Sequence, residues 1–237
     1  MEYSPRTIAL LTELLHPPVA PDPRPVQKLH NAMFESGQPD YSSFAVTAQG
    51  PILANAGSHP GSVSQAAFNP DRIQFREELS ALTIEAFADR VQRIASQAAT
   101  ARGVGIYMGQ QVTVRSLVNP RNHRDALSFL RQGLLRFDDE LDSFPSTPNL
   151  YGLRLSFPGN QAGQQGQDFA GAAAYGLRIE SYTSDPRSLF LEAQATFGPA
   201  TAGGDLAILG QRIARVYEFL GVQALAFIER FDQPQQA

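Results

Sequence analysis

The chain contains no cysteine and no tryptophan, and only one of its cationic side chains, Lys28, is a lysine. The lack of cysteine in 237 residues excludes disulfides, thiol catalysis and any iron–sulfur or cysteine-ligated metal site. The net charge of −4 argues against a general nucleic-acid binder, because phosphate contacts require an excess of cations. We therefore expect no nucleic-acid partner.

Long hydrophobic runs are missing as well. Arg, Gln, Glu or Gly interrupts the apolar stretches every few residues, whereas a helix needs about 20 apolar residues to span a bilayer. The N-terminus, which reads Met-Glu-Tyr-Ser-Pro-Arg, lacks the basic start and apolar run of a signal peptide. These absences predict a soluble, cytoplasmic protein without a membrane partner.

Sequence signatures of catalysis and cofactor binding are also missing. There is no P-loop, no dinucleotide fingerprint and no nucleophile elbow. The histidines show neither the i, i+4 pairing nor the His-Glu spacing of a metal site; they are His16, His30, His59 and His123. We expect no metal and no cofactor, and a protein that is more readily explained without enzymatic activity.

The chain does contain a faint internal similarity. The clearest match joins 71–77 with 186–192, since a Pro/Asp turn precedes each segment and an amphipathic helix follows it. Two weaker matches join 11–17 with 114–120, and 103–107 with 221–225. These matches predict two pseudo-repeated halves, 1–102 and 103–237, within one continuous structural domain. Chance similarity is the alternative, because any chain of mixed helices and strands repeats such elements.

Hydrophobic periodicity predicts the secondary structure. Alternation favours a first strand over 7–15, short strands over 44–47, 52–53 and 63–68, and longer strands over 72–79 and 104–118. It favours an antiparallel meander over 150–157, 172–183 and 188–197, and a closing strand over 222–231. A spacing of three to four residues predicts helices over 26–37, 83–101, 123–135 and 205–220.

Several helix details follow from the same patterns. Thr83 is the expected N-cap of the second helix, which should bury Phe87, Val91 and Ile94. The helix over 123–135 should bury Leu127, Leu130 and Leu134, and Gly221 should end the last helix.

The order of these elements is β-α-β-β-β-α-β followed by α-β-β-β-α-β. It predicts an α+β fold, in which helices lie on one face of a mostly antiparallel, curved sheet. In outline this order resembles the duplicated saddle or helix-grip folds, where a curved sheet carries paired helices on one side. The resemblance concerns topology alone and implies no function.

A cluster of cations marks one candidate site. Arg121, His123 and Arg124 crowd the expected start of a helix, where positive side chains are disfavoured by the helix dipole. A phosphate, a carboxylate or an acidic segment of a partner would bind there to backbone donors and guanidinium groups together. In the alternative interpretation, Asn122 and Asp125 cap the helix, and the arginines point to water or pair with acidic residues 138–140.

A second candidate lies on the polar face of the meander. Arg154, Arg178, Glu180 and Glu192 should form a ladder of opposite charges across neighbouring strands. Paired carboxylates such as Glu180 and Glu192 can also serve as acid and base. Tyr182 and Phe190 add aromatic groups of the kind enriched at interfaces.

Two functions remain open from the sequence. The first is a non-catalytic binding or assembly protein that acts through a protein–protein interface, as a homo-oligomer. The alternative is an enzyme or sensor that binds a phosphorylated or carboxylated small molecule near residues 121–124.

Overall fold

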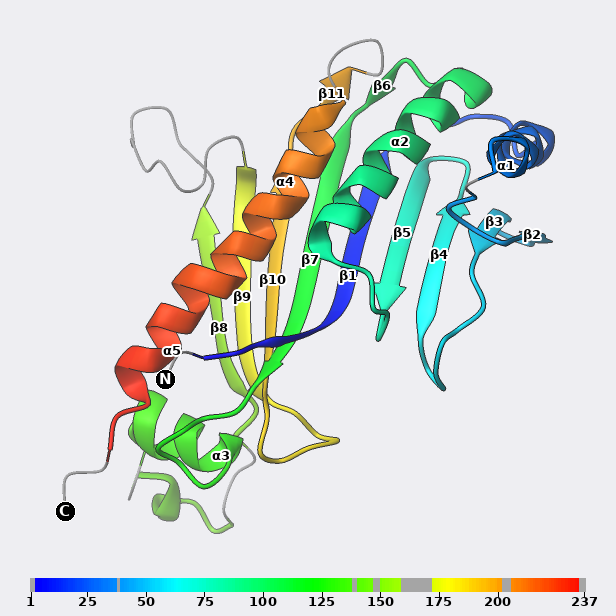
Figure 1. Cartoon of the computed structure of the whole chain (residues 1–237). Coiled ribbons are helices and arrows are strands. Elements are labelled where there is room, and N and C mark those ends of the chain that lie inside the picture. Colours follow the sequence, from blue (N-terminus) through cyan, green and yellow to red (C-terminus); the bar gives the residue numbers. More distant parts are fainter. Residues whose placement is uncertain are drawn as a thin grey trace.

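The computed structural model describes residues 3–37, 39–137, 140–146, 150–158, 172–201 and 206–234. It contains a nine-stranded antiparallel sheet with helices packed on one face, and this sheet is not closed into a barrel. Figure 1 shows α2 and α4 lying side by side across that face. The expected α+β fold class is confirmed. Within these residues, no helix is long and apolar enough to cross a membrane.

The first part of the chain runs through one long strand, a helix, four shorter strands and a long helix. These are β1 (Arg6–Leu15), α1 (Arg24–Glu35), β2 (Ser43–Thr47), β3 (Gly50–Ala54), β4 (Val63–Phe68), β5 (Arg72–Glu78) and α2 (Ile84–Arg102).

The second part begins with β6 (Ile106–Tyr107) and β7 (Gly109–Val118), followed by α3 (Ala126–Ser128), η1 (Phe129–Leu134) and η2 (Glu140–Ser143). The meander follows as β8 (Gly152–Pro158), β9 (Ala172–Ser181) and β10 (Leu189–Phe197). The chain then forms β11 (Ala200–Thr201) and a helix made of α4 (Ala207–Glu218), η4 (Phe219–Ala224) and α5 (Leu225–Phe231).

The sheet order is β2-β3-β4-β5-β1-β7-β10-β9-β8, and the short strands β6 and β11 form a separate pair. The two long strands β1 and β7 pair in antiparallel fashion at the centre. Each of them also pairs with the last strand of a meander, β1 with β5 and β7 with β10. The segments 71–77 and 186–192 overlap β5 and β10, so both enter strands in corresponding places. That the halves arose by duplication stays a prediction.

Helix α2 follows the predicted pattern closely. Thr83 is its N-cap, since its side chain accepts a hydrogen bond from the Ala86 N–H. Gly103 ends the helix in the left-handed conformation, with φ of 68°. Phe87, Val91 and Ile94 are all fully buried. The expected core face of this helix is therefore confirmed.

The predictions for the helix after residue 122 need correction. The helix begins at Ala126 rather than His123, and its N-cap is Asp125, whose side chain accepts from the Ser128 N–H. Leu130 and Leu134 are buried as predicted, but Leu127 is 49 % exposed. The helix widens into a π-type turn at Phe129, and a wider turn rotates the buried face away from the one that regular α-helical spacing predicts.

The C-terminal segment is also different from the prediction. Residues 222–231 continue the last helix instead of forming a closing strand, and Gly221 lies inside it. Gly221 does not have a positive φ, whereas Gly103 does. The helix passes Gly221 in a second π-type turn and buries Leu225 and Ile228 one turn further on. The similarity between 103–107 and 221–225 therefore does not reflect a shared structure.

Candidate functional site

The face of the sheet opposite α2 and α4 carries the charge ladder. Side chains alternate along a strand, so Ile179 and Leu191 face the helices and the core, while Arg178, Glu180 and Glu192 face the other way. Over β5, β1 and β7 this second face is hollowed to a volume of about 340 Å³. Polar side chains, including Glu13, line most of the hollow.

The ladder is a continuous series of ion pairs across four strands. Arg115 on β7 pairs with Glu192 on β10 at 2.7 Å, and Glu192 pairs with Arg178 on β9 at 2.9 Å. Arg178 also pairs with Glu180 at 2.7 Å, and Glu180 pairs with Arg154 on β8 at 3.3 Å. The structure thus brings together the four residues singled out in the sequence. Arg115 was not predicted as part of the ladder. Its strand, β7, lies outside the meander in the sequence and pairs with β10 only in the folded protein.

An aromatic pair lies beside the ladder, on the side of its two middle strands. The rings of Tyr182 and Phe190 stack with their centroids 6.3 Å apart and their planes 13° from parallel. The guanidinium carbon of Arg178 lies 5.7 Å from the centroid of the Phe190 ring. We call this surface the ladder face and define it by Arg115, Arg154, Arg178, Glu180, Tyr182, Phe190 and Glu192.

The ladder holds Glu180 in its charged form. Burial raises the pKa of Glu180, but hydrogen bonds and charges from Arg178 and Arg154 outweigh burial and lower it below its ordinary value. The hydrogen bond to Glu180 in turn raises the pKa of Arg178. Arginines pair with both Glu180 and Glu192, so the geometry favours a structural ladder over an acid–base pair.

The cationic segment at 121–124 meets a carboxylate of its own chain. Asp232, which follows α5, is 3 % exposed and accepts hydrogen bonds from the Arg121 N–H at 2.5 Å and the Asn122 N–H at 3.0 Å. His123 Nδ1 lies 2.9 Å from the same carboxylate, and the Tyr3 hydroxyl also donates to it. The backbone donors expected to bind an anion are therefore occupied by Asp232.

The hydrogen bonds also set the charge of Asp232. Burial raises its pKa, but the Arg121 N–H, the Tyr3 hydroxyl, His123 and the Asn122 N–H together lower it below the ordinary value. A carboxylate that accepts several hydrogen bonds in a buried place is stabilised as an anion. We call Asp232 and its partners Tyr3, Arg121, Asn122 and His123 the Asp232 cluster. The cluster connects the N-terminal segment, the chain between β7 and α3, and the C-terminal helix.

The three candidate anion-binding residues have separate surroundings. The His123 side chain is 3 % exposed and faces Asp232. The Arg124 side chain is 88 % exposed and pairs with the helix cap Asp125 at 3.0 Å. Arg121 lies over the ring of Tyr3, with its guanidinium carbon 3.9 Å from the ring centroid. Arg121 also lines a cleft.

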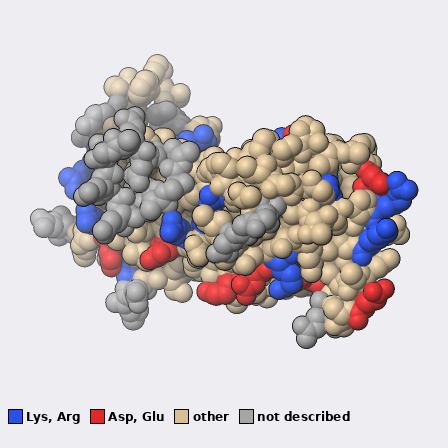
Figure 2. Space-filling model, turned by 90° about the horizontal axis from the view of Figure 1, so that it is seen from above, with Lys and Arg blue, Asp and Glu red and all other residues tan. Residues whose placement is uncertain are grey.

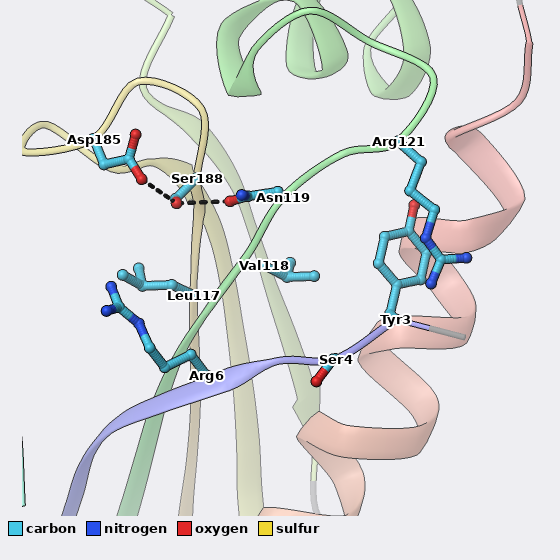
Figure 3. A pocket seen from close by; sticks show the side chains of 9 residues that line it. All are labelled: Tyr3, Ser4, Arg6, Leu117, Val118, Asn119, Arg121, Asp185 and Ser188. Atoms are coloured by element: carbon cyan, nitrogen blue, oxygen red, sulfur yellow. Dashed lines mark hydrogen bonds between the residues drawn. The ribbon is translucent and has the colours of Figure 1, made fainter. Parts of the chain in front are cut away.

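Figure 3 shows this cleft, which has a volume of about 480 Å³ and lies where the chain enters β1 and leaves β7. Arg6 and Arg121 extend from opposite sides of the view. Ser188 Oγ donates to Asn119 Oδ1 at 2.8 Å or to Asp185 Oδ2 at 2.7 Å. Hydrogen bonds from Ser188 and Arg187 lower the pKa of Asp185, so an anion in the cleft would face a carboxylate.

A glycine fits the Asp232 cluster closely. A Cβ atom on Gly133 would lie 2.9 Å from the Phe231 carbonyl oxygen and 3.0 Å from His123 Nε2. Alanine is the better helix former by about 1 kcal/mol, yet we expect Gly133→Ala to lower the free energy of unfolding by about 1–3 kcal/mol, as overpacking does. Urea unfolding measures this change, and a more stable variant would show that the contact relaxes freely.

Comparisons with known proteins do not identify the chain. No family model matches it, and no curated protein matches it in sequence. Among the residues that the structure describes, no three His, Asp or Glu side chains converge to hold a metal ion. Figure 2 shows acidic and basic side chains next to one another, without an extended patch of one sign on the coloured part of that view.

Proposed function

We propose that the chain is a non-catalytic binding or assembly protein that engages a protein partner through the ladder face. The observation that carries this proposal is a sheet face on which ion pairs hold the arginines in place and two aromatic rings stack beside them. Tyr, Phe and Arg are the residue types enriched at the centre of interfaces. Side chains already ordered by their neighbours lose less conformational entropy when a partner binds.

The same proposal includes a cytoplasmic, homo-oligomeric protein without a nucleic-acid partner. The charges of the ladder alternate in sign, and opposite charges pair internally. Such a face does not offer the surplus of cations that a phosphate backbone requires. A protein surface with complementary charges is the better fit, because alternating charges fix the register of two partners.

Replacement of one aromatic ring tests this proposal. We expect Phe190→Glu to weaken binding of the physiological partner at least tenfold, which corresponds to losing about 1.4 kcal/mol of contact. The partner would be identified by cross-linking in the cells that make the protein, and its affinity measured with purified components. Phe34→Glu is the matched control, since Phe34 is an aromatic residue on α1 that is 46 % exposed and distant in sequence from the ladder face. Equal binding by the Phe190→Glu variant would refute the proposal.

The alternative function, binding of a small phosphorylated or carboxylated molecule, has one observation in its favour. Arg6 and Arg121 both line the cleft of about 480 Å³. A thermal-shift screen against nucleotides and sugar phosphates tests it, because a specific ligand raises the melting temperature as its concentration exceeds Kd. The ladder-face proposal expects no shift. A shift that disappears in the Arg121→Gln/Arg124→Gln variant would favour the small-molecule function instead.

A further inference from the structure

Strand β8 ends the nine-stranded sheet on one side, and β9 is its only strand neighbour within the described ranges. Proteins usually blunt such an edge with unpaired charged side chains, a central proline, a bulge or a very short strand. The one charged residue of β8, Arg154, is paired with Glu180 of β9. β8 has seven residues, its pairing with β9 runs without a register shift, and its only proline is the last residue, Pro158. Its edge therefore remains competent to pair with another strand.

The hydrogen bonding of β8 identifies the groups that point outward. The Ser181 N–H donates to the Tyr151 carbonyl at 3.3 Å, next to the register pair Gly152 and Glu180. In an antiparallel pair, hydrogen-bonded positions alternate with positions that are not bonded. The backbone groups of Leu153, Leu155 and Phe157 consequently face β9. Those of Gly152, Arg154 and Ser156 point to the free edge.

One antiparallel register makes this edge complementary to itself. When Leu155 lies opposite Leu155 of a second copy, Arg154 lies opposite Ser156, and Gly152 lies opposite Pro158. Every outward N–H then finds a carbonyl, and the missing N–H of Pro158 falls at the end of the ladder. A shift by two residues in one direction would place Arg154 opposite Arg154, where like charges repel. A shift in the other direction would leave Gly152 beyond the end of the partner strand. The self-complementary register thus avoids the clash.

The side chains also fit a second copy. Leu155 and Phe157 are partly exposed and line an apolar hollow of about 440 Å³ between β8 and the C-terminal helix. Phe219 and Phe227 contribute to the same hollow. The apolar row of a second β8 would continue this surface on the same side of the sheet. Arg154, whose side chain is 71 % exposed, stays on the opposite side with Glu180.

We infer that two copies of this chain associate through their β8 edges and form one continuous sheet, with Leu155 at the two-fold axis. This inference deepens the assembly role proposed above and rests on it. Its test is separate, because it changes a backbone donor at the sheet edge and leaves Phe190 intact.

Sedimentation velocity of the full chain should show a dimer that dissociates on dilution. Ser156→Pro should weaken dimerisation at least about thirtyfold, because both symmetry-related Ser156 donors are lost. The fold should persist, since this N–H does not bond to β9, and circular dichroism with urea unfolding verifies that. Ser156→Ala keeps the N–H and should dimerise like the parent.

A cysteine placed at the axis provides the second test. Opposed residues of a pair that is not hydrogen-bonded have Cα atoms about 4.5 Å apart, within reach of a disulfide. The chain has no other cysteine, so Leu155→Cys should cross-link on mild oxidation, and Phe157→Cys should not. A parent that stays monomeric, a Ser156→Pro variant that dimerises normally, or equal cross-linking at both positions would overturn the inference. If Ser156→Pro remains a monomer and still binds the partner of the ladder face, the two proposals stand separately.

Discussion

Replacement of Phe87 by alanine should lower the free energy of unfolding by about 3–5 kcal/mol. Phe87 is fully buried on the face of α2 that also buries Val91 and Ile94. Removal of the ring loses its transfer free energy from water, and it leaves a cavity that the surrounding helices and strands fill only in part. Denaturant unfolding measures the effect as a lower midpoint with an unchanged m-value.

The matched control for this substitution lies on the opposite side of the same helix. Asp89 is exposed, so Asp89→Ala should change the free energy of unfolding by no more than about 0.5 kcal/mol. A Phe87→Ala effect below about 1 kcal/mol would contradict the assignment of this helix face to the core, because truncated core aromatics lose several times that amount.

Helix α2 was predictable because the signals that specify it are local. The periodic apolar residues and the N-cap Thr83 both act within the helix itself, and each matches its observed role. The meander strands were predictable for a similar reason, since alternation reports directly which face of a strand is buried. Both patterns also favour the α+β class.

The residue matches between the two halves show that such patterns do not fix an exact alignment of one half with the other. Leu10 lies opposite Val114 in the central pair of strands, so both side chains point to the same face of the sheet. The match of Pro17 with Pro120 would equate Leu10 with Thr113, which points to the other face. Side chains alternate between the two faces of a strand. The alignment of the two halves must therefore be shifted by one residue here, so that residues facing the same side are matched. Sequence similarity alone does not specify that shift.

The two parts of the candidate site also differ in how well the sequence predicts them. The charge ladder was predictable, because its members recur on alternate positions of strands that follow one another in the chain. The Asp232 cluster was not. Its carboxylate is separated from Arg121 by more than a hundred residues, so no local sequence pattern connects the two. The cations at 121–124 predicted that an anion binds there, but only the tertiary fold shows that the Asp232 carboxylate accepts hydrogen bonds from this segment.

Removal of that carboxylate has the other large expected effect. Asp232→Ala should lower the free energy of unfolding by about 3–5 kcal/mol, because it leaves several buried hydrogen-bond donors without their acceptor. The Arg121 N–H, the Asn122 N–H and the Tyr3 hydroxyl would each lose a buried acceptor. Denaturant unfolding at neutral pH measures the loss. Asp125→Ala is the control, and it should cost only about 1 kcal/mol as a helix cap.

The pH dependence of the same variant identifies the charge as the cause. The pKa of Asp232 is lowered in the folded protein, so its stabilisation is complete above the unfolded value of about 3.9. It is lost as the pH falls through the lower folded pKa, where the carboxylate must take up a proton. The difference in stability between the parent and Asp232→Ala should therefore be constant near neutrality and should shrink in acid. A difference that stays constant below pH 3.9 would mean that the side chain acts through its shape and not through its charge.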